Sequence, residues 1–248
     1  MIKEAALALA ACTLAAKAGF QANSFSPSEG RTLKYQIAIP SELKPQQKVP
    51  LIIFFHGAGE RGDDNQAQLT HGARQLLAFS ETNKQPSIIV APQCPKGKQW
   101  VDTPWGDLSH TMPESPSESM QLAIELLDSL IEQLPVDTSR IYVSGLSMGG
   151  YASWDIIQRR PHFFAAAFIV CGGADTTRAE SLKHLPLWFF HGSEDTVVKT
   201  SRSRDMHQAL QAAGSKAKYT EYPGVNHNSW TPAYNDQTAL SWLFKQKK

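Results

Sequence analysis

Continuous apolar runs, separated by segments with helical spacing, dominate the pattern of hydrophobic and polar positions along this chain. Runs without polar alternation are typical of strands buried on both faces of a parallel sheet. Segment 32–40 alternates instead and predicts a half-exposed edge strand, while the more polar segment 216–224 predicts a strand near the other edge. The continuous runs are 49–57, 86–92, 140–145, 166–173 and 185–192.

Segments with helical spacing lie between these runs. Segment 115–135 repeats apolar residues every three or four positions and carries serines near its start that can cap a helix. A second helix is predicted over 201–214, ending at Gly214, and a last one over 235–246. Strands that alternate with helices predict a single α/β domain, with a mostly parallel central sheet and helices on both faces.

The first 18 residues predict a separate leader. They contain an early lysine, an Ala/Leu-rich run and an A-K-A sequence at 16–18 that fits a signal-peptide cleavage site. The sequence Leu9-Ala10-Ala11-Cys12 resembles a bacterial lipobox, which would place a lipid on Cys12 after cleavage. We therefore expect export (periplasmic, secreted or lipid-anchored), with a retained helix on a cytoplasmic protein as the alternative. No run approaches the roughly 20 apolar residues of a membrane span.

Composition narrows the choice of partners. The formal net charge is +1 and the basic residues are scattered, so we expect no nucleic-acid partner. Cys94 and Cys171 follow strands that should not be neighbours in the sheet, so both are expected to be free, small, buried residues rather than a disulfide. The sequence contains no His/Cys/Asp cluster at metal-ligand spacing and no sign of a cofactor, so neither is expected.

The pentapeptide Gly145-Leu146-Ser147-Met148-Gly149 matches G-x-S-x-G and lies between a predicted strand and a predicted helix. In that setting the serine occupies a sharp turn with its hydroxyl exposed at the sheet edge. The alternative is a glycine-rich packing turn without chemistry. Because the motif has the strand and helix it requires on either side, we interpret Ser147 as a catalytic nucleophile.

A serine nucleophile needs a base that is oriented by an acid, and after this motif the chain order is acid, then histidine. His227 follows the last predicted strand in a loop at the expected sheet edge, and His191 is the alternative base. For the acid, Asp195 lies in the loop after segment 185–192, and Asp175 is the alternative. We therefore predict a triad of Ser147, Asp195 and His227.

Two backbone amides are expected to stabilise the oxyanion of the tetrahedral intermediate. One is the amide of Met148, which follows the nucleophile at a helix N-terminus. The second is expected in the glycine-rich loop after segment 49–57, at Ala58 or, less favoured, at Gly57 or Gly59. A phosphate cradle is disfavoured because this loop lacks the Lys-Ser/Thr ending of nucleoside-triphosphate sites.

Six segments of the chain together resemble α/β-hydrolase esterases. They are "PLIIFFHGAGERGDDN", "VAPQCPKG", "RIYVSGLSMGGYASWD", "CGGAD", "FFHGSEDTVV" and "YPGVNHNSW". The group includes polyhydroxybutyrate depolymerases and feruloyl or acetylxylan esterases, often labelled phospholipase/carboxylesterase or dienelactone-hydrolase-like. The resemblance covers about residue 20 to the C-terminus, so it implies an α/β-hydrolase domain over 19–248. It also implies a carboxylic ester hydrolase with the triad named above.

The segments 57–71 and 93–115 are long for simple connections and leave the sheet edge where open α/β folds bind ligands. No insertion is large enough for a separate cap domain. Trp100, Trp105 and Trp230 are expected to wall the site and to suit an aryl acyl group or a sugar, unless they only pin the loops.

The predicted function is a serine carboxylesterase for short-chain acyl or aryl (feruloyl- or acetyl-type) esters, on small molecules or linked to polysaccharide. The alternatives are an oligopeptidase-type serine peptidase, an acyltransferase and a catalytically silent binding module. Product analysis with an added alcohol would distinguish the acyltransferase, and an intact Ser, Asp and His in order argues against the binding module.

Overall fold

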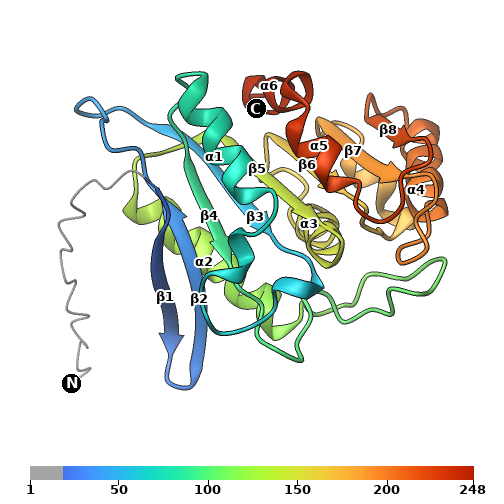
Figure 1. Ribbon diagram of the computed structural model, residues 1–248, viewed down its shortest axis with the longest axis horizontal. Coiled ribbons are helices and arrows are strands. Elements are labelled where there is room, and N and C mark those ends of the chain that lie inside the picture. Colours follow the sequence, from blue (N-terminus) through green and yellow to red (C-terminus); the bar gives the residue numbers. More distant parts are fainter. Residues whose placement is uncertain (1–18) are drawn as a thin grey trace.

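A single eight-stranded sheet runs through the part of the chain that the structure describes, residues 19–248 of this computed structural model (Figure 1). The leader predicted for residues 1–18, with Cys12, lies outside the described residues. The strands are β1 (Gln21–Ser28), β2 (Arg31–Ala38), β3 (Val49–Phe55), β4 (Ile88–Pro92), β5 (Val136–Leu146), β6 (Ala166–Val170), β7 (Leu187–Gly192) and β8 (Lys218–Tyr222). They are ordered β1-β2-β4-β3-β5-β6-β7-β8.

Helices cover both faces of this sheet. Helices α2 (Glu118–Gln133), α3 (Met148–Arg159) and α4 (Ser201–Ala212) pack on one face, and α1 (Ala73–Thr82), α5 (Trp230–Asn235) and α6 (Gln237–Lys245) on the other. Three 3₁₀ segments complete the described elements: η1 (Ala58–Glu60), η2 (Ala67–Leu69) and η3 (Thr176–Leu182). Neighbouring strands from β4 to β8 are all parallel, which confirms the predicted α/β architecture.

Strand β3 shows why a continuous apolar run becomes a central strand. Leu51, Ile53 and Phe55 point into the core beneath α2 and α3, whereas Ile52 and Phe54 point into the core beneath α1 and α6. All five side chains are fully buried. Because helices cover both faces, alternate positions of the strand meet apolar surroundings, and each such side chain contributes about 1.5–3 kcal/mol of burial.

The prediction of segment 32–40 as an edge strand is wrong, because β2 lies one position inside the sheet. The polar strand β1 pairs antiparallel with β2 and forms the actual edge. Its residues alternate between half-buried and exposed, so hydrogen bonding to β2 supports it more than apolar burial does. The other edge is β8, as its polar composition predicts.

Two helices were not expected from the sequence. Helix α1 follows the loop after β3 and begins beyond Gly72, whose φ is +75°. Helix α5 directly follows the loop that carries His227. Segment 93–115, by contrast, contains no helix or strand, so its interpretation as a long loop is confirmed.

Helix α2 begins where a serine cap was expected, because the Ser117 hydroxyl accepts a hydrogen bond from the Met120 amide at 3.1 Å. Cys94 and Cys171 are both free and buried, as predicted, after strands that β3 and β5 separate. Among the described helices, none has the length and apolar character needed to cross a bilayer.

Candidate active site

Ser147 lies between the end of β5 and the first turn of α3, in the strand–turn–helix setting that its motif predicts. Its φ of +52° and ψ of −119° are unfavourable for a residue with a Cβ atom, so this turn is strained. The Ser147 amide donates to the Val170 carbonyl at the end of β6, at 3.0 Å. Neighbouring strand ends therefore hold the strained turn in place.

Two motif glycines allow helix and strand to approach closely at this turn. A Cβ on Gly145 would lie 2.2 Å from the Gly149 carbonyl oxygen, and one on Gly149 would lie 1.9 Å from the Phe55 carbonyl oxygen. Both distances are far inside van der Waals contact, so the backbone excludes any side chain at either position. The close approach also brings the start of α3 against the end of β3, from which the predicted oxyanion loop leaves.

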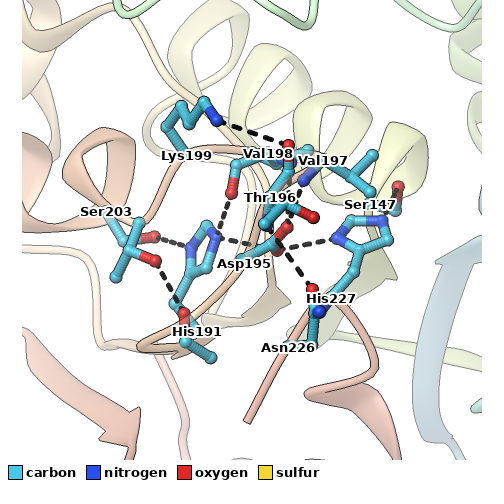
Figure 2. A network of polar contacts seen from close by, with 12 residues as sticks. Ser147, His191, Asp195, Thr196, Val197, Val198, Lys199, Ser203, Asn226 and His227 are labelled. Carbon is cyan, nitrogen blue, oxygen red and sulfur yellow. Dashed lines mark hydrogen bonds and ion pairs between the residues drawn. The ribbon is translucent and has the colours of Figure 1, made fainter. Parts of the chain in front are cut away.

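A hydrogen-bonded chain joins Ser147, His227 and Asp195, three residues that come from three separate loops (Figure 2). His227 Nε2 lies 2.9 Å from Ser147 Oγ, and His227 Nδ1 lies 2.7 Å from Asp195 Oδ2. Because a carboxylate oxygen accepts, Nδ1 carries the proton and the Nε2 lone pair faces the serine hydroxyl. This is the geometry in which an imidazole can remove a serine proton.

The Asp195 side chain is fully buried, yet its surroundings favour the charged form. Burial alone would raise the pKa of this carboxyl, but contacts with His191 and His227 and the Val198 amide hold it well below its usual range. The second oxygen, Oδ1, accepts from the amides of Val197 at 2.8 Å and Val198 at 2.9 Å. The carboxylate is therefore charged, and both of its oxygens are held by polar contacts.

The two alternatives considered for the triad lie elsewhere. Asp175 caps η3 by accepting from the Thr177 amide at 3.0 Å and also accepts from the Met112 amide at 2.9 Å. His191 is fully buried behind Asp195 and contacts Ser203 rather than Ser147. Neither is arranged as acid or base for Ser147.

The loop after β3, which carries Ala58, is held by His56. The ring is buried; its Nδ1–H donates to the Gly57 carbonyl at 2.6 Å, and Nε2 accepts from the Cys94 amide at 2.9 Å. Burial lowers the pKa of His56 to about 4, so the ring stays neutral and keeps both bonds. Since the Gly57 carbonyl and the Ala58 amide share one planar peptide, His56 also fixes where the Ala58 N–H points.

The three tryptophans predicted to wall the site differ in how deeply they are buried. Trp100 is fully buried against Phe55, and its indole N–H donates to the His56 carbonyl at 3.3 Å, so its prediction as a wall residue is wrong. It pins the loop instead. Trp105 and Trp230 are half-buried, and the Trp230 ring lies edge-on to His227 with centroids 5.2 Å apart.

This arrangement matches a known family. A family model described as phospholipase/carboxylesterase matches residues 36–237, which contain β3, the turn at Ser147 and the loops of Asp195 and His227. The chain belongs to the phospholipase/carboxylesterase family. The expected α/β-hydrolase fold and the resemblance to esterases are thereby confirmed.

Individual relatives of this carboxylesterase-family chain have names that refer to esterases or to a lysophospholipase. A bifunctional acetylxylan esterase/xylanase of Neocallimastix patriciarum is 26% identical over 85% of this chain, which covers only 30% of that protein. Lysophospholipase-like protein 1 of Mus musculus is 25% identical, with 71% of this chain and 79% of that protein covered. A thermostable esterase of known structure is 37% identical with a TM-score of 0.85, covering 92% of this chain and 63% of that one. The chain thus spans less than a third of the acetylxylan esterase/xylanase and less than two thirds of the thermostable esterase.

The loop 93–115 of this carboxylesterase-family domain is anchored by side chains that sequence reasoning did not identify. Arg202, from α4, is buried, donates to the Asp107 carbonyl at 2.8 Å and contacts the His110 ring. Its guanidinium also lies over the Tyr151 ring, 5.4 Å from the centroid. No local motif marks Arg202, because all its partners lie about 50 to 95 residues away along the chain.

One further group concerns metal binding. Among the described residues, Cys171, Asp195 and His227 bring three potential ligand atoms within 4.8 Å of one another. Two of them are already hydrogen-bonded to each other, and burial raises the pKa of the Cys171 thiol to about 12, which disfavours the thiolate a metal would need. We assign no metal to this group, and the absence of a metal requirement stays a prediction.

Proposed function

We propose that the protein is a serine carboxylesterase in which Ser147 is the nucleophile, His227 the general base and acid, and Asp195 the residue that orients His227. One observation supports this most directly: a single imidazole lies 2.9 Å from Ser147 Oγ and 2.7 Å from Asp195 Oδ2. The strained turn at Ser147 and the fully buried carboxylate are the features that such a triad requires.

In the proposed reaction Ser147 Oγ attacks the ester carbonyl carbon while His227 Nε2 takes the hydroxyl proton. The resulting tetrahedral oxyanion is stabilised by the amides of Met148 and Ala58, the latter oriented through His56. Collapse breaks the bond to the alkoxide, which receives the proton from His227 and leaves as the alcohol. Water then attacks the acyl-enzyme by the same route, releasing the carboxylic acid and restoring Ser147.

Two half-buried tryptophans support the substrate class of this proposal. Trp230 lies beside His227 on one side, and Trp105 lies under the Arg61 guanidinium, 5.7 Å from the ring centroid, on the loop 93–115. Aromatic surfaces of this kind suit an aryl acyl group or a sugar face, and an uncapped site admits bulky esters. Aryl esters and esters linked to sugars are therefore proposed as substrates, together with the short-chain acyl esters expected from the sequence. The proposed catalytic unit is residues 19–248. Export through the leader stays a prediction, and the mass of the mature N-terminus would test it.

Hydrolysis of p-nitrophenyl esters, from acetate to octanoate together with ferulate, tests the proposal. The wild type should cleave short or aryl esters, and Ser147→Ala should lose the activity by at least a factor of about 1,000. Ser181→Ala is the matched control, because its exposed hydroxyl contacts only the Arg178 carbonyl. Cleavage of peptide anilides but not esters would indicate a peptidase, and turnover that survives Ser147→Ala would refute the nucleophile.

A further inference from the structure

His191 is a fully buried imidazole that the reaction described above does not use. It is the penultimate residue of β7, four residues before Asp195, and lies on the far side of that carboxylate from His227 (Figure 2). Its Nε2 lies 2.9 Å from the Val198 carbonyl oxygen and 3.2 Å from Asp195 Oδ2, and its Nδ1 lies 2.7 Å from Ser203 Oγ. Each ring nitrogen therefore has a specific partner.

These partners decide where the proton of His191 resides. A backbone carbonyl can only accept, so Nε2 carries the hydrogen, and Nδ1 is then free to accept from the Ser203 hydroxyl. The neutral Nε2–H tautomer satisfies both contacts without placing a charge in the core. Its N–H donates to the Val198 carbonyl, and the same nitrogen also lies 3.2 Å from Asp195 Oδ2.

At Nε2, His191 is placed to act on both oxygens of the Asp195 carboxylate. It contacts Oδ2 directly, and it also holds Val198, whose own amide donates to Oδ1 at 2.9 Å. His227 Nδ1 competes for the same Oδ2 from the other side at 2.7 Å. The negative charge of Asp195 is therefore divided between two imidazoles.

We propose that His191 is a positioning residue of this site: as a neutral donor it holds the Asp195 carboxylate in the orientation that His227 needs and limits how strongly Asp195 raises the basicity of His227. The proposal rests on the triad roles given under Proposed function. It assigns a task to a residue outside the triad, whose hydrogen bonds go to Ser203 and Val198.

Glu221, a second carboxylate near His191, has partners of its own. Glu221 is the register partner of His191 on β8, but its carboxylate binds the Arg204 guanidinium at 2.6 Å and 2.8 Å and accepts from the Tyr219 hydroxyl at 2.7 Å. The charge of Asp195 is consequently the main one that His191 meets at Nε2.

Two amide substitutions separate this role from simple packing. In His191→Gln the side-chain amide reaches about as far as Nε2 and can still donate toward Asp195 and Val198. In His191→Asn the shorter amide reaches only the Nδ1 position, beside Ser203. Both variants remove the imidazole, but His191→Gln keeps the hydrogen bonds of Nε2 and His191→Asn keeps that of Nδ1. Thermal unfolding of each variant reports any loss of fold.

The pH profiles of kcat and of kcat/KM for a p-nitrophenyl ester are the decisive measurements. His191→Asn should lower kcat by about tenfold, the lower range for a hydrogen bond to a charged group, and shift the acidic limb upward by about half a pH unit. The upward shift is expected because Asp195 would then direct its full charge at His227. His191→Gln should restore most of kcat and the wild-type limb.

Equal behaviour of the Gln and Asn variants, or a loss of rate with an unmoved acidic limb, would overturn the proposal and leave His191 a packing residue. Failure of the triad itself is distinguished separately, because it would appear as unchanged activity in Ser147→Ala, whatever the His191 variants do. A loss of rate in His191→Asn that tracks only its thermal unfolding would likewise count against the positioning role.

Discussion

Lowering the pH below neutrality protonates His56 in the unfolded chain well before it protonates the same ring in the folded protein. Burial lowers the pKa of His56 from 6.5 to about 4. Above about pH 6.5 the ring is neutral in both states, so its titration does not change the unfolding free energy. As the pH falls from there toward 4, only the unfolded chain gains the proton, so the folded state loses stability. The loss is complete below the folded pKa.

The size of this effect follows from the shift. A displacement from 6.5 to about 4, at roughly 1.4 kcal/mol per unit, corresponds to about 3.5 kcal/mol of unfolding free energy. That is a large share of the roughly 5–15 kcal/mol by which a domain is stable. Acid would also break the bond from the Cys94 amide to His56 Nε2, because a protonated nitrogen cannot accept.

Urea unfolding followed by tryptophan fluorescence, at several pH values between about 7 and 4.5, measures the effect. The informative variant is His56→Asn, whose amide can still donate to the Gly57 carbonyl but does not titrate. Its stability should decline less steeply with acid than that of the wild type. His162→Asn, at an exposed position, is the matched control and should retain the wild-type slope. Identical slopes for His56→Asn and the wild type would refute the reasoning that burial keeps this ring neutral.

Two substitutions test the packing around the site. Gly149→Ala should lower the unfolding free energy by about 3 kcal/mol or prevent folding, because its Cβ would lie 1.9 Å from the Phe55 carbonyl oxygen, whereas Gly59→Ala has nothing within 4 Å and should be tolerated; equal melting temperatures would contradict this. Arg202→Met should cost about 2 kcal/mol and make the loop 93–115 sensitive to limited proteolysis, because the buried donors to the Asp107 carbonyl are lost. Arg204→Met, on the exposed face of the same helix, should leave both measurements nearly unchanged.

Much of the fold can be predicted from the sequence because the central strands are buried on both faces. Such strands must be apolar at every position, and that requirement is visible in one dimension. Strand β1 escaped prediction for the opposite reason: its polar residues form a strand only because the edge of β2 offers hydrogen-bond partners. Helices α1 and α5 were missed because short amphipathic segments depend on the surface they pack against.

The triad candidates could also be selected from the sequence, since a strand–turn–helix serine fixes the order in which acid and histidine follow. Choosing between His227 and His191 required the tertiary structure. His191 lies at the end of β7 and His227 follows β8, at the same sheet edge. Only their distances from Ser147 and Asp195 separate the proposed base from a buried neighbour of the proposed acid. Pattern and order along the chain thus determined the architecture and the site's chemical class. The burial of Trp100, the anchoring by Arg202 and the second imidazole at Asp195 arise from contacts between residues distant in sequence, which only the folded chain brings together.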